Sequence, residues 1–111
     1  MDTLNHYRAI IERVLTDYSQ LKYAWGDVEC HSLFDRQRDR YALITLGWNR
    51  RQRTHYCLVH LEIINGKIWI QEDGIEHGIT TDLEAAGIPK RDIVLGFQPP
   101  EIRPLTEYAV A

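Results

Sequence analysis

Two runs of β-branched and aromatic residues lie on either side of Asn65-Gly66, within the stretch from Tyr56 to Asp73. Asn-Gly accepts the positive φ angles that a type I′ turn requires, so the stretch predicts a β-hairpin. The turn sets the register, and the expected pairs are Ile64 with Lys67, Ile63 with Ile68, Glu62 with Trp69, Leu61 with Ile70, and His60 with Gln71. Because side chains alternate across a strand, one face is expected to be wholly apolar, with Cys57, Val59, Leu61, Ile63, Ile68 and Ile70. The other face is mixed, with Tyr56, Leu58, His60, Glu62, Ile64, Trp69 and Gln71.

A helical period precedes the strands. Between residues 3 and 21, apolar side chains recur at steps of three and four, at Leu4, Tyr7, Ile11, Val14, Leu15, Tyr18 and Leu21. This single apolar stripe predicts an amphipathic helix that lies across one face of a sheet. Gly26 ends the segment.

Asp27–Asp35 and Arg40–Asn49 read as two further strands, each followed by a short polar turn. With the hairpin they form a four-stranded antiparallel meander. The second of these strands is apolar on both sides, with Ala42, Ile44, Leu46 and Trp48 against Tyr41 and Leu43. Both faces of the sheet therefore need cover, and the first helix supplies it for one.

The pattern changes after Asp73. Residues 80–87 predict a short helix, since Thr81 to Glu84 has capping-box spacing and Gly87 suits a left-handed carboxyl cap. Residues 92–98 form a fifth strand or part of a loop, and residues 103–111 form a tail that docks on its own domain or on a neighbour. The predicted fold is α+β, a single domain over residues 1–111. Its N-terminal helix packs on a four- to five-stranded antiparallel meander, with a short second helix and a docked C-terminal tail. That helix and tail are expected to cover only part of the second face.

Composition narrows the class of protein. The chain has 111 residues and a net charge of −3, which does not indicate a general nucleic-acid or anionic-membrane binder. It has no apolar stretch of 18 residues and no signal-peptide pattern at its start, so we expect a cytoplasmic protein that does not span a membrane. Cys30 and Cys57 lie among apolar residues in predicted strands, and we expect two reduced core thiols.

Few residues suggest catalysis. Asp73, Glu76 and His77 are carboxylate and imidazole groups of the kind that hold zinc or manganese, but their spacing is not a recognised ligand motif. Cys57 and His60 fall on opposite faces of a regular strand, which separates a nucleophile from a base. We therefore predict no catalytic residues, no metal and no cofactor, and hence a protein that is not an enzyme.

Arginines are concentrated in two turns. Six lie between Arg36 and Arg53, against the single acid Asp39. In a meander the 35–39 turn lies beside Asn65-Gly66 and the 49–53 turn at the opposite end, roughly 25 Å away. Direct nucleic-acid binding through Arg50, Arg51 and Arg53 is the alternative function that this pattern allows.

Several uncommon runs recur in the order found in one known family. They are the opening D-x-L-N-H-Y-R, Gly26-Asp27-Val28-Glu29, Phe34-Asp35, Gly47-Trp48, Gly66-Lys67-Ile68-Trp69-Ile70-Gln71, Gly87-Ile88-Pro89-Lys90, Asp92-Ile93-Val94-Leu95-Gly96-Phe97 and Tyr108-Ala109-Val110-Ala111. In these runs the chain resembles the XisI family, the cyanobacterial controlling-factor proteins for excision of the fdxN element. One departure is Ile75, where the family pattern has Thr.

The resemblance implies a small α/β accessory protein. Such a protein acts with an XisH-type protein partner in programmed excision of the fdxN DNA element during heterocyst differentiation, while a separate recombinase performs the reaction. An uncovered apolar sheet face also indicates a contact surface. We therefore expect a homo-oligomer or a complex with the partner, with the candidate interface residues Trp48, Trp69, Phe97 and Tyr108.

Overall fold

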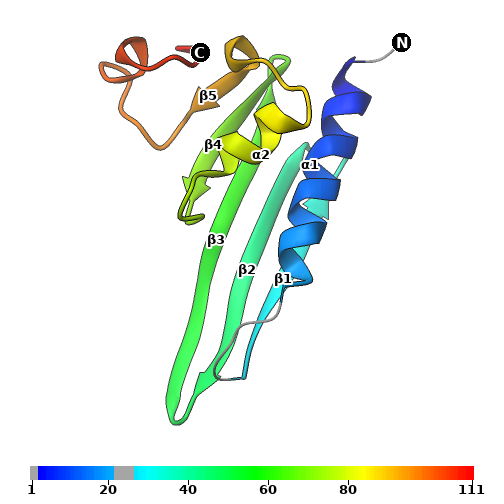
Figure 1. Ribbon diagram of the computed structural model, residues 1–111, viewed down its shortest axis with the longest axis vertical. Helices are drawn as coiled ribbons and strands as arrows, with labels where there is room; N and C mark the ends of the chain where they lie inside the picture. Colours follow the sequence, from blue (N-terminus) through cyan, green and yellow to red (C-terminus); the bar gives the residue numbers. More distant parts are fainter. Residues whose placement is uncertain (1–2, 22–26) are drawn as a thin grey trace.

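The computed structural model describes residues 3–21 and 27–111; the predicted break at Gly26 lies outside them. The elements in chain order are α1 (Thr3–Ser19), β1 (Asp27–Asp35), β2 (Arg40–Asn49), β3 (Gln52–Ile64), β4 (Lys67–Asp73), α2 (Ile79–Ala85), β5 (Ile93–Leu95), and the short 3-10 helices Lys90–Asp92 and Arg103–Leu105. The strands form one five-stranded sheet in the order β1-β2-β3-β4-β5 (Figure 1). The α+β prediction is confirmed, including the meander of the first four strands. In the described ranges, no helix combines the length and the apolar character that crossing a membrane requires.

The fifth strand differs from the prediction in direction. β5 pairs with β4 in parallel, with Ile68 opposite Ile93 and Ile70 opposite Leu95. The chain leaves β4, passes through α2 and returns to the same end of the sheet. A connection that contains a helix is long enough for this crossover, which a tight hairpin turn cannot make.

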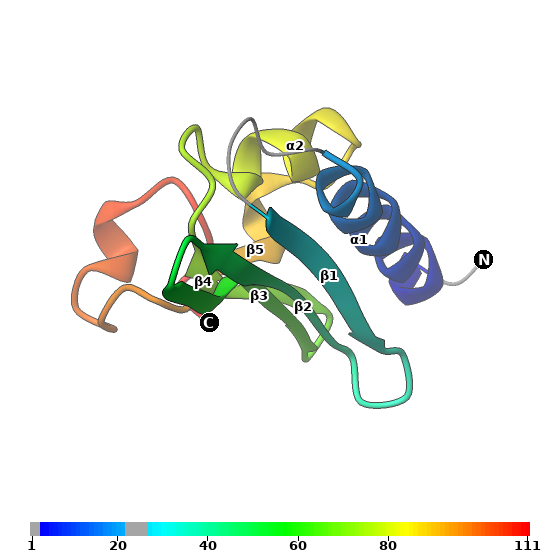
Figure 2. The same cartoon turned by 90° about the horizontal axis from the view of Figure 1, so that it is seen from below.

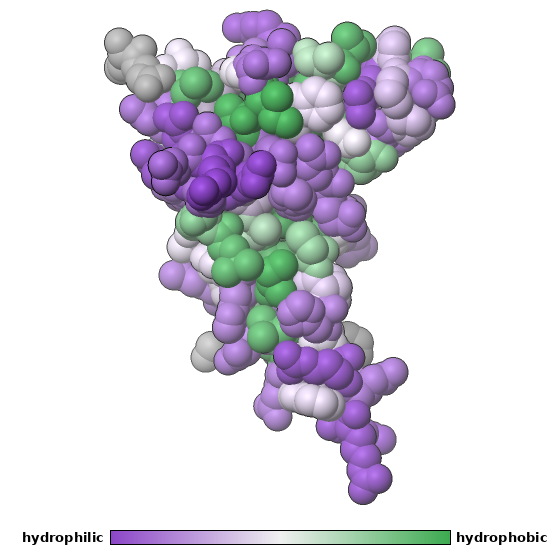
Figure 3. Space-filling model, turned by 180° about the vertical axis from the view of Figure 1, so that it is seen from behind, coloured by the Kyte–Doolittle hydropathy of each residue, from purple (hydrophilic) through white to green (hydrophobic). Residues whose placement is uncertain are grey.

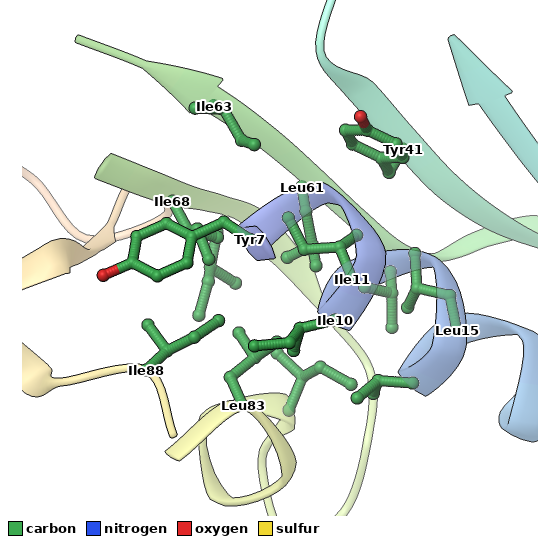
Figure 4. Close-up of a cluster of buried hydrophobic side chains, with 14 of the residues drawn as sticks. Tyr7, Ile10, Ile11, Leu15, Tyr41, Leu61, Ile63, Ile68, Leu83 and Ile88 are labelled. Carbon is green, nitrogen blue, oxygen red and sulfur yellow. The ribbon is translucent and has the colours of Figure 1, made fainter. Parts of the chain in front are cut away.

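α1 supplies the main cover of the sheet. Its buried side chains are Tyr7, Ile10, Ile11, Val14 and Leu15. They meet buried residues of the strands such as Leu61 and Ile68 (Figure 4). We call the sheet face that α1 covers the inner face, and the opposite one the outer face.

α2 lies on the same side of the sheet as α1 (Figure 2). Its buried residues Ile79 and Leu83 belong to the same core cluster as the side chains of α1. The expectation that the second helix helps to cover the second face is therefore wrong. Among the described residues, the C-terminal tail is the segment that covers the outer face.

The tail docks as predicted. The backbone N–H of Ala109 donates to the carbonyl of Ile93 at 2.8 Å, which extends the sheet beyond β5. On the outer face, the Arg103 guanidinium lies 4.9 Å from the centre of the Trp69 ring, a cation–π contact. The tail thus covers the outer face at β4 and β5.

Two β-bulges change the faces on which residues lie. The predicted pairs hold from Ile64–Lys67 to Leu61–Ile70, but His60 pairs with Glu72 because Gln71 is an extra residue in β4. In β3 the register with β2 shifts between Leu43–Val59 and Ile44–Cys57, so that Leu58 is the extra residue. An extra residue reverses the alternation beyond it.

The face assignments beyond the β3 bulge are consequently wrong. Cys57 shares the outer face with its partner Ile44, whereas Tyr56 pairs with Thr45 on the inner face. Leu58 and Tyr56 line an inner-side hollow together with Tyr18 of α1. The tight turn itself is confirmed, since Asn65 and Gly66 both have positive φ angles, 51° and 80°.

The C-terminal end of α2 was predicted correctly, and its N-terminal end was not. Gly87 has φ 107°, and the N–H groups of Ile88 and Gly87 donate to the carbonyls of Leu83 and Glu84. This is a Schellman motif, as its glycine suggested. The capping box is absent, because α2 begins at Ile79 and Thr81 lies inside it. Asp73 instead accepts from the N–H of Ile79 at 3.0 Å.

An ion pair joins α1 to the β1–β2 turn. The guanidinium of Arg8 donates to both carboxylate oxygens of Asp39, at 2.6 and 3.1 Å. The Tyr41 hydroxyl donates to the same carboxylate at 3.2 Å. The hydrogen bond from Arg8 is the main reason why the pKa of Asp39 is lowered.

We predict that Asp39→Asn lowers the free energy of unfolding by about 1–3 kcal/mol at neutral pH, the range for a charge-assisted hydrogen bond in a partly buried site. A lowered native pKa stabilises the fold above the ordinary aspartate pKa, and this stabilisation is lost as the pH falls through the native value. The difference between wild type and variant should therefore narrow below about pH 4. Urea unfolding across this pH range measures it. The exposed Glu101→Gln is the control, and a difference that persists at low pH contradicts the prediction.

Candidate interaction surface

The strand register arranges the outer face of β1, β2 and β3 in three rows. The middle row, on β2, is apolar, with Ala42, Ile44, Leu46 and Trp48. The row on β1 holds Asp27, Glu29, His31, Leu33 and Asp35. The row on β3 holds Arg53, His55, Cys57, His60 and Glu62. Figure 3 shows the hydrophobic side chains as a strip over the middle of this face, with hydrophilic side chains above and below it.

This surface is open to solvent in the part of the chain that the structure describes. Leu33 is 56% exposed and Trp48 is 50% exposed. Both helices lie on the other side of the sheet, and the tail reaches the outer face only at β4 and β5 (Figure 2). Leu33 lies beside Ala42, six positions along β2 from Trp48, and the half-buried Ile44 and Leu46 lie between these two ends. A contiguous apolar surface of this kind marks a contact surface more often than isolated apolar side chains do.

Charge is divided across the apolar row. At the end near the 49–53 turn, β1 presents Asp27 and Glu29, while β3 presents Arg53 and His55. The guanidinium of Arg53 lies 5.3 Å from the centre of the Trp48 ring and also donates to the carbonyl of Gly47 at 3.4 Å. This division could be predicted from the sequence only in part. The alternating acids of Asp27–Asp35 were visible, but the bulge that places His55 on the outer face was not.

The predicted contact residues form two groups. Trp48 lies level with Arg53, whereas Trp69 lies level with Glu62, nine positions along β3 and roughly 30 Å away. Phe97 is 45% exposed and lies beside β4, since its N–H donates to the carbonyl of Ile70. We call Trp69, Phe97 and Tyr108 the tail-side group.

Tyr108 already has partners within the chain. Its hydroxyl donates to Glu84 of α2 at 2.9 Å, and the ammonium of Lys90 lies 5.3 Å from its ring centre. Burial is the first reason why the pKa of Tyr108 is raised. The contacts of Tyr108 therefore also fix the tail against α2.

The two arginine turns lie at opposite ends of the hairpins, as predicted, because Arg40 pairs with Glu62 and Asn49 with Gln52. The cluster at the 35–39 turn is neutralised by carboxylates. Its ion pairs are Arg36–Glu12 at 2.9 Å, Arg38–Asp35 at 3.2 Å and Arg40–Glu62 at 3.9 Å. Arg50 and Arg51 are exposed at the other turn and have no carboxylate partner among the described residues. Arg50 also has a positive φ of 59°, a backbone conformation that residues other than glycine rarely adopt.

The turn at Asp73, whose residue types are of the kind that hold metals, forms hydrogen bonds within the chain. The carboxylate of Asp73 accepts from the N–H groups of Ile75 and Ile79 at 3.1 and 3.0 Å. His77 contacts Asp82 at 3.1 Å and the hydroxyl of Tyr18 at 2.9 Å. Over residues 3–21 and 27–111, no group of three or more His, Cys, Asp or Glu side chains is arranged to hold a metal ion.

The cysteines are separated by the sheet. Cys30 is buried on the inner face, opposite Thr45, and Cys57 lies on the outer face, opposite Ile44. The prediction of two core thiols is therefore wrong for Cys57, although both cysteines are free. The bulge also places Cys57 on the same face as His60, contrary to the parity argument. His60, however, contacts Glu62 at 2.9 Å, and burial is the first cause of the raised pKa of the Cys57 thiol, which opposes formation of a nucleophilic thiolate.

Comparisons with known proteins agree with the fold. The sequence model of the XisI family, described as XisI protein, matches residues 1–110. A crystal structure of a XisI-like protein from Anabaena variabilis ATCC 29413 superposes with a TM-score of 0.89, at 34% identity over 97% of this chain and 99% of that one. The fdxN element excision controlling factor XisI from the same organism superposes with a TM-score of 0.83, at 40% identity over 99% of this chain and 100% of that one. None of the proteins with curated descriptions matches the chain.

We predict that Asp73→Ala lowers the free energy of unfolding by about 1–2 kcal/mol, because it removes the acceptor for two N–H groups at the start of α2. Asp73→Asn, which keeps one acceptor oxygen, should lose less. Thermal unfolding measures both, with the exposed Glu76→Gln as the control in the same turn. Added zinc or manganese should leave the melting temperature of the wild type unchanged, since only a ligand of the native state raises it. A rise that Asp73→Ala abolishes contradicts this structural role.

Proposed function

Because the chain belongs to the XisI family, we propose that it is a non-enzymatic controlling factor that acts through protein contact. The name of the Anabaena relative links that protein to excision of the fdxN element. We propose the same process for this chain, during heterocyst differentiation in the cytoplasm, with an XisH-type protein as partner. The family match over residues 1–110 supports treating the chain as one functional unit.

The observation that carries this proposal is the uncovered apolar row of the outer face. A row of Ile44, Leu46 and Trp48 flanked by charged residues has the apolar centre and polar rim of a protein contact surface. Several of the described acidic and imidazole groups are held in caps and ion pairs, such as Asp73 with Ile79 and His60 with Glu62. These contacts favour a binding role over catalysis.

The tail-side group is the proposed site for the XisH-type partner. Phe97 presents an exposed aromatic ring, and its backbone N–H donates to the carbonyl of Ile70, the residue after Trp69 in β4. Aromatic side chains account for much of the binding energy at interfaces. Both residues lie at β4 and β5, away from the uncovered rows of β1, β2 and β3.

We predict that the wild-type chain co-purifies with the neighbouring XisH-type protein when the two are co-expressed and one carries a tag. Phe97→Ser should weaken this association by about tenfold or more, as expected for loss of an aromatic contact. Leu105→Ser is the matched control, because Leu105 is 80% exposed on the same tail. Failure of the wild-type pair to associate at micromolar concentration contradicts the proposed function.

A second candidate is direct nucleic-acid binding at the 49–53 turn. It is favoured by Arg50 and Arg51, which have no carboxylate partner in the part of the chain that the structure describes, beside Arg53 and the exposed ring of Trp48. Phosphate contacts by cations and stacking on an aromatic ring are the two usual elements of single-strand binding.

If this turn binds nucleic acid, the logarithm of the affinity should fall linearly with the logarithm of salt concentration. The Arg50→Ser, Arg51→Ser double variant should reduce the slope by about 1–2, whereas Arg36→Ser, at the neutralised turn, should leave it unchanged. Fluorescence anisotropy with labelled single- and double-stranded DNA measures this. Absence of binding at about 50 mM salt removes this candidate.

A further inference from the structure

We propose that the outer face of β1, β2 and β3 binds a second copy of this chain, face to face. The twofold axis runs parallel to the strands, and the β2 row lies on it. This inference rests on the proposed function in one respect, because it takes the uncovered outer face to be a protein contact surface. It adds that the protein bound there is a second copy of the same chain. The tail-side group is left free for the XisH-type partner.

The register divides the three strands into levels across the sheet. Asp27, Trp48 and Arg53 lie at one level, and Glu29, Leu46 and His55 lie at another, two residues further along β1. At each of these levels an acid on β1 and a base on β3 lie on opposite sides of an apolar residue on β2. The order acid, apolar, base is the same at both levels.

A twofold axis along β2 exchanges the two sides of each level. It places β1 of one copy over β3 of the other at an unchanged height. Asp27 then faces Arg53 of the second copy and Glu29 faces His55 of the second copy, and symmetry makes each contact twice. On the axis, Leu46 and Trp48 pack against their own counterparts. A surface that pairs with itself in this way is what a twofold dimer requires.

The other simple symmetry is unfavourable. A twofold axis perpendicular to the strands places β1 over β1 and β3 over β3. If it lies between the Trp48 and Leu46 levels, Asp27 faces Glu29 and Arg53 faces His55, so like groups meet on both strands. If it lies at the Ile44 level, Arg53 faces Glu62, but Asp27 faces Asp35. Side-by-side antiparallel pairing of two β1 edges, centred on His31, brings Asp27 of one copy opposite Asp35 of the other. Like charges placed opposite each other are destabilising.

The remaining parts of the outer face are compatible with the pairing. At the far end of the strip the pairing brings Asp35 over Glu62 of the second copy. Both carboxylates are neutralised within their own chain, by the ion pairs Arg38–Asp35 at 3.2 Å and Arg40–Glu62 at 3.9 Å. β4, β5 and the tail lie beyond β3 in the sheet. Because the edge strand β1 of the second copy lies over β3, these segments stay outside the contact between the copies. The tail and the second copy would therefore cover complementary parts of one face.

The dimensions also suit a dimer. Three strands of nine residues cover roughly 15 by 30 Å in plan. Two such strips in contact remove on the order of 1,000 Å² of accessible surface, at the lower end of specific interfaces. Stacked sheets pack about 10 Å apart with their strands about 30° from parallel, which keeps levels near Leu46 aligned to within a few ångströms.

Sedimentation velocity of the untagged chain, without any partner, tests the proposal. The wild type should sediment at twice the chain mass of 13.0 kDa at micromolar concentration. Asp27→Arg and Arg53→Asp should each weaken dimerisation by at least about tenfold, since each places like charges together twice. The double variant, in which the charges are exchanged, should return to within about threefold of wild type. Arg51→Asp, with the same charge change in the same hairpin, should dimerise as wild type does.

Circular dichroism establishes whether each variant is folded. If an Asp27 or Arg53 variant does not fold, the same test is repeated with Glu29→Lys, His55→Glu and the double variant that combines them. A wild type that stays monomeric to about 100 µM overturns the proposal, and so does a double variant no better than the single ones. A monomer that still co-purifies with the XisH-type protein overturns only the self-pairing. A dimer that fails to co-purify supports the self-pairing and contradicts the proposed function.

Discussion

One constraint shapes the molecule: β2 is apolar on both faces, and both helices cover the same face. Tyr41 and Leu43 are buried under α1, while Ile44, Leu46 and Trp48 point the other way. Burial of apolar surface is the main stabilising term in folding and association alike. On the inner face the two helices supply this burial, whereas the described residues leave the outer face of β1, β2 and β3 open to another molecule.

The same constraint explains why one part of the outer face is covered by the tail and another part is left open. The C-terminal tail, through Arg103 over Trp69 and Ala109 beside Ile93, covers the outer face where β4 and β5 extend the sheet. The three remaining strands carry acids on β1 and bases on β3 beside an apolar centre. A part covered within the chain and an open part with an apolar centre and charged flanks together support the proposed role in protein association.

Much of this fold could be predicted from the sequence because its signals are local. The helix period of Thr3–Ser19, the Asn65-Gly66 turn and the Gly87 cap each depend on a few neighbouring residues. The direction of β5 and the side on which α2 packs depend on tertiary contacts, and no local pattern encodes them. The bulges at Leu58 and Gln71 had the largest consequence, since one extra residue moved Cys57 and Tyr56 to the opposite faces.

The candidate surface was predictable only in part. The exposed ring of Trp48 and the two separate arginine turns followed from alternation and topology. The apparent metal ligands could not be told from capping groups, because an aspartate before a helix suits both roles until the N–H groups of Ile75 and Ile79 are located. The acid and base rows emerged only once the register was known.

Hydroxyl-radical footprinting tests most directly whether the outer face is covered in solution. Oxidation of Trp48 is compared with that of Leu105, which is 80% exposed on the tail. The ratio should fall severalfold as the chain concentration rises from about 1 µM to about 100 µM, across the range in which specific complexes form. A ratio that stays constant over this range contradicts the account.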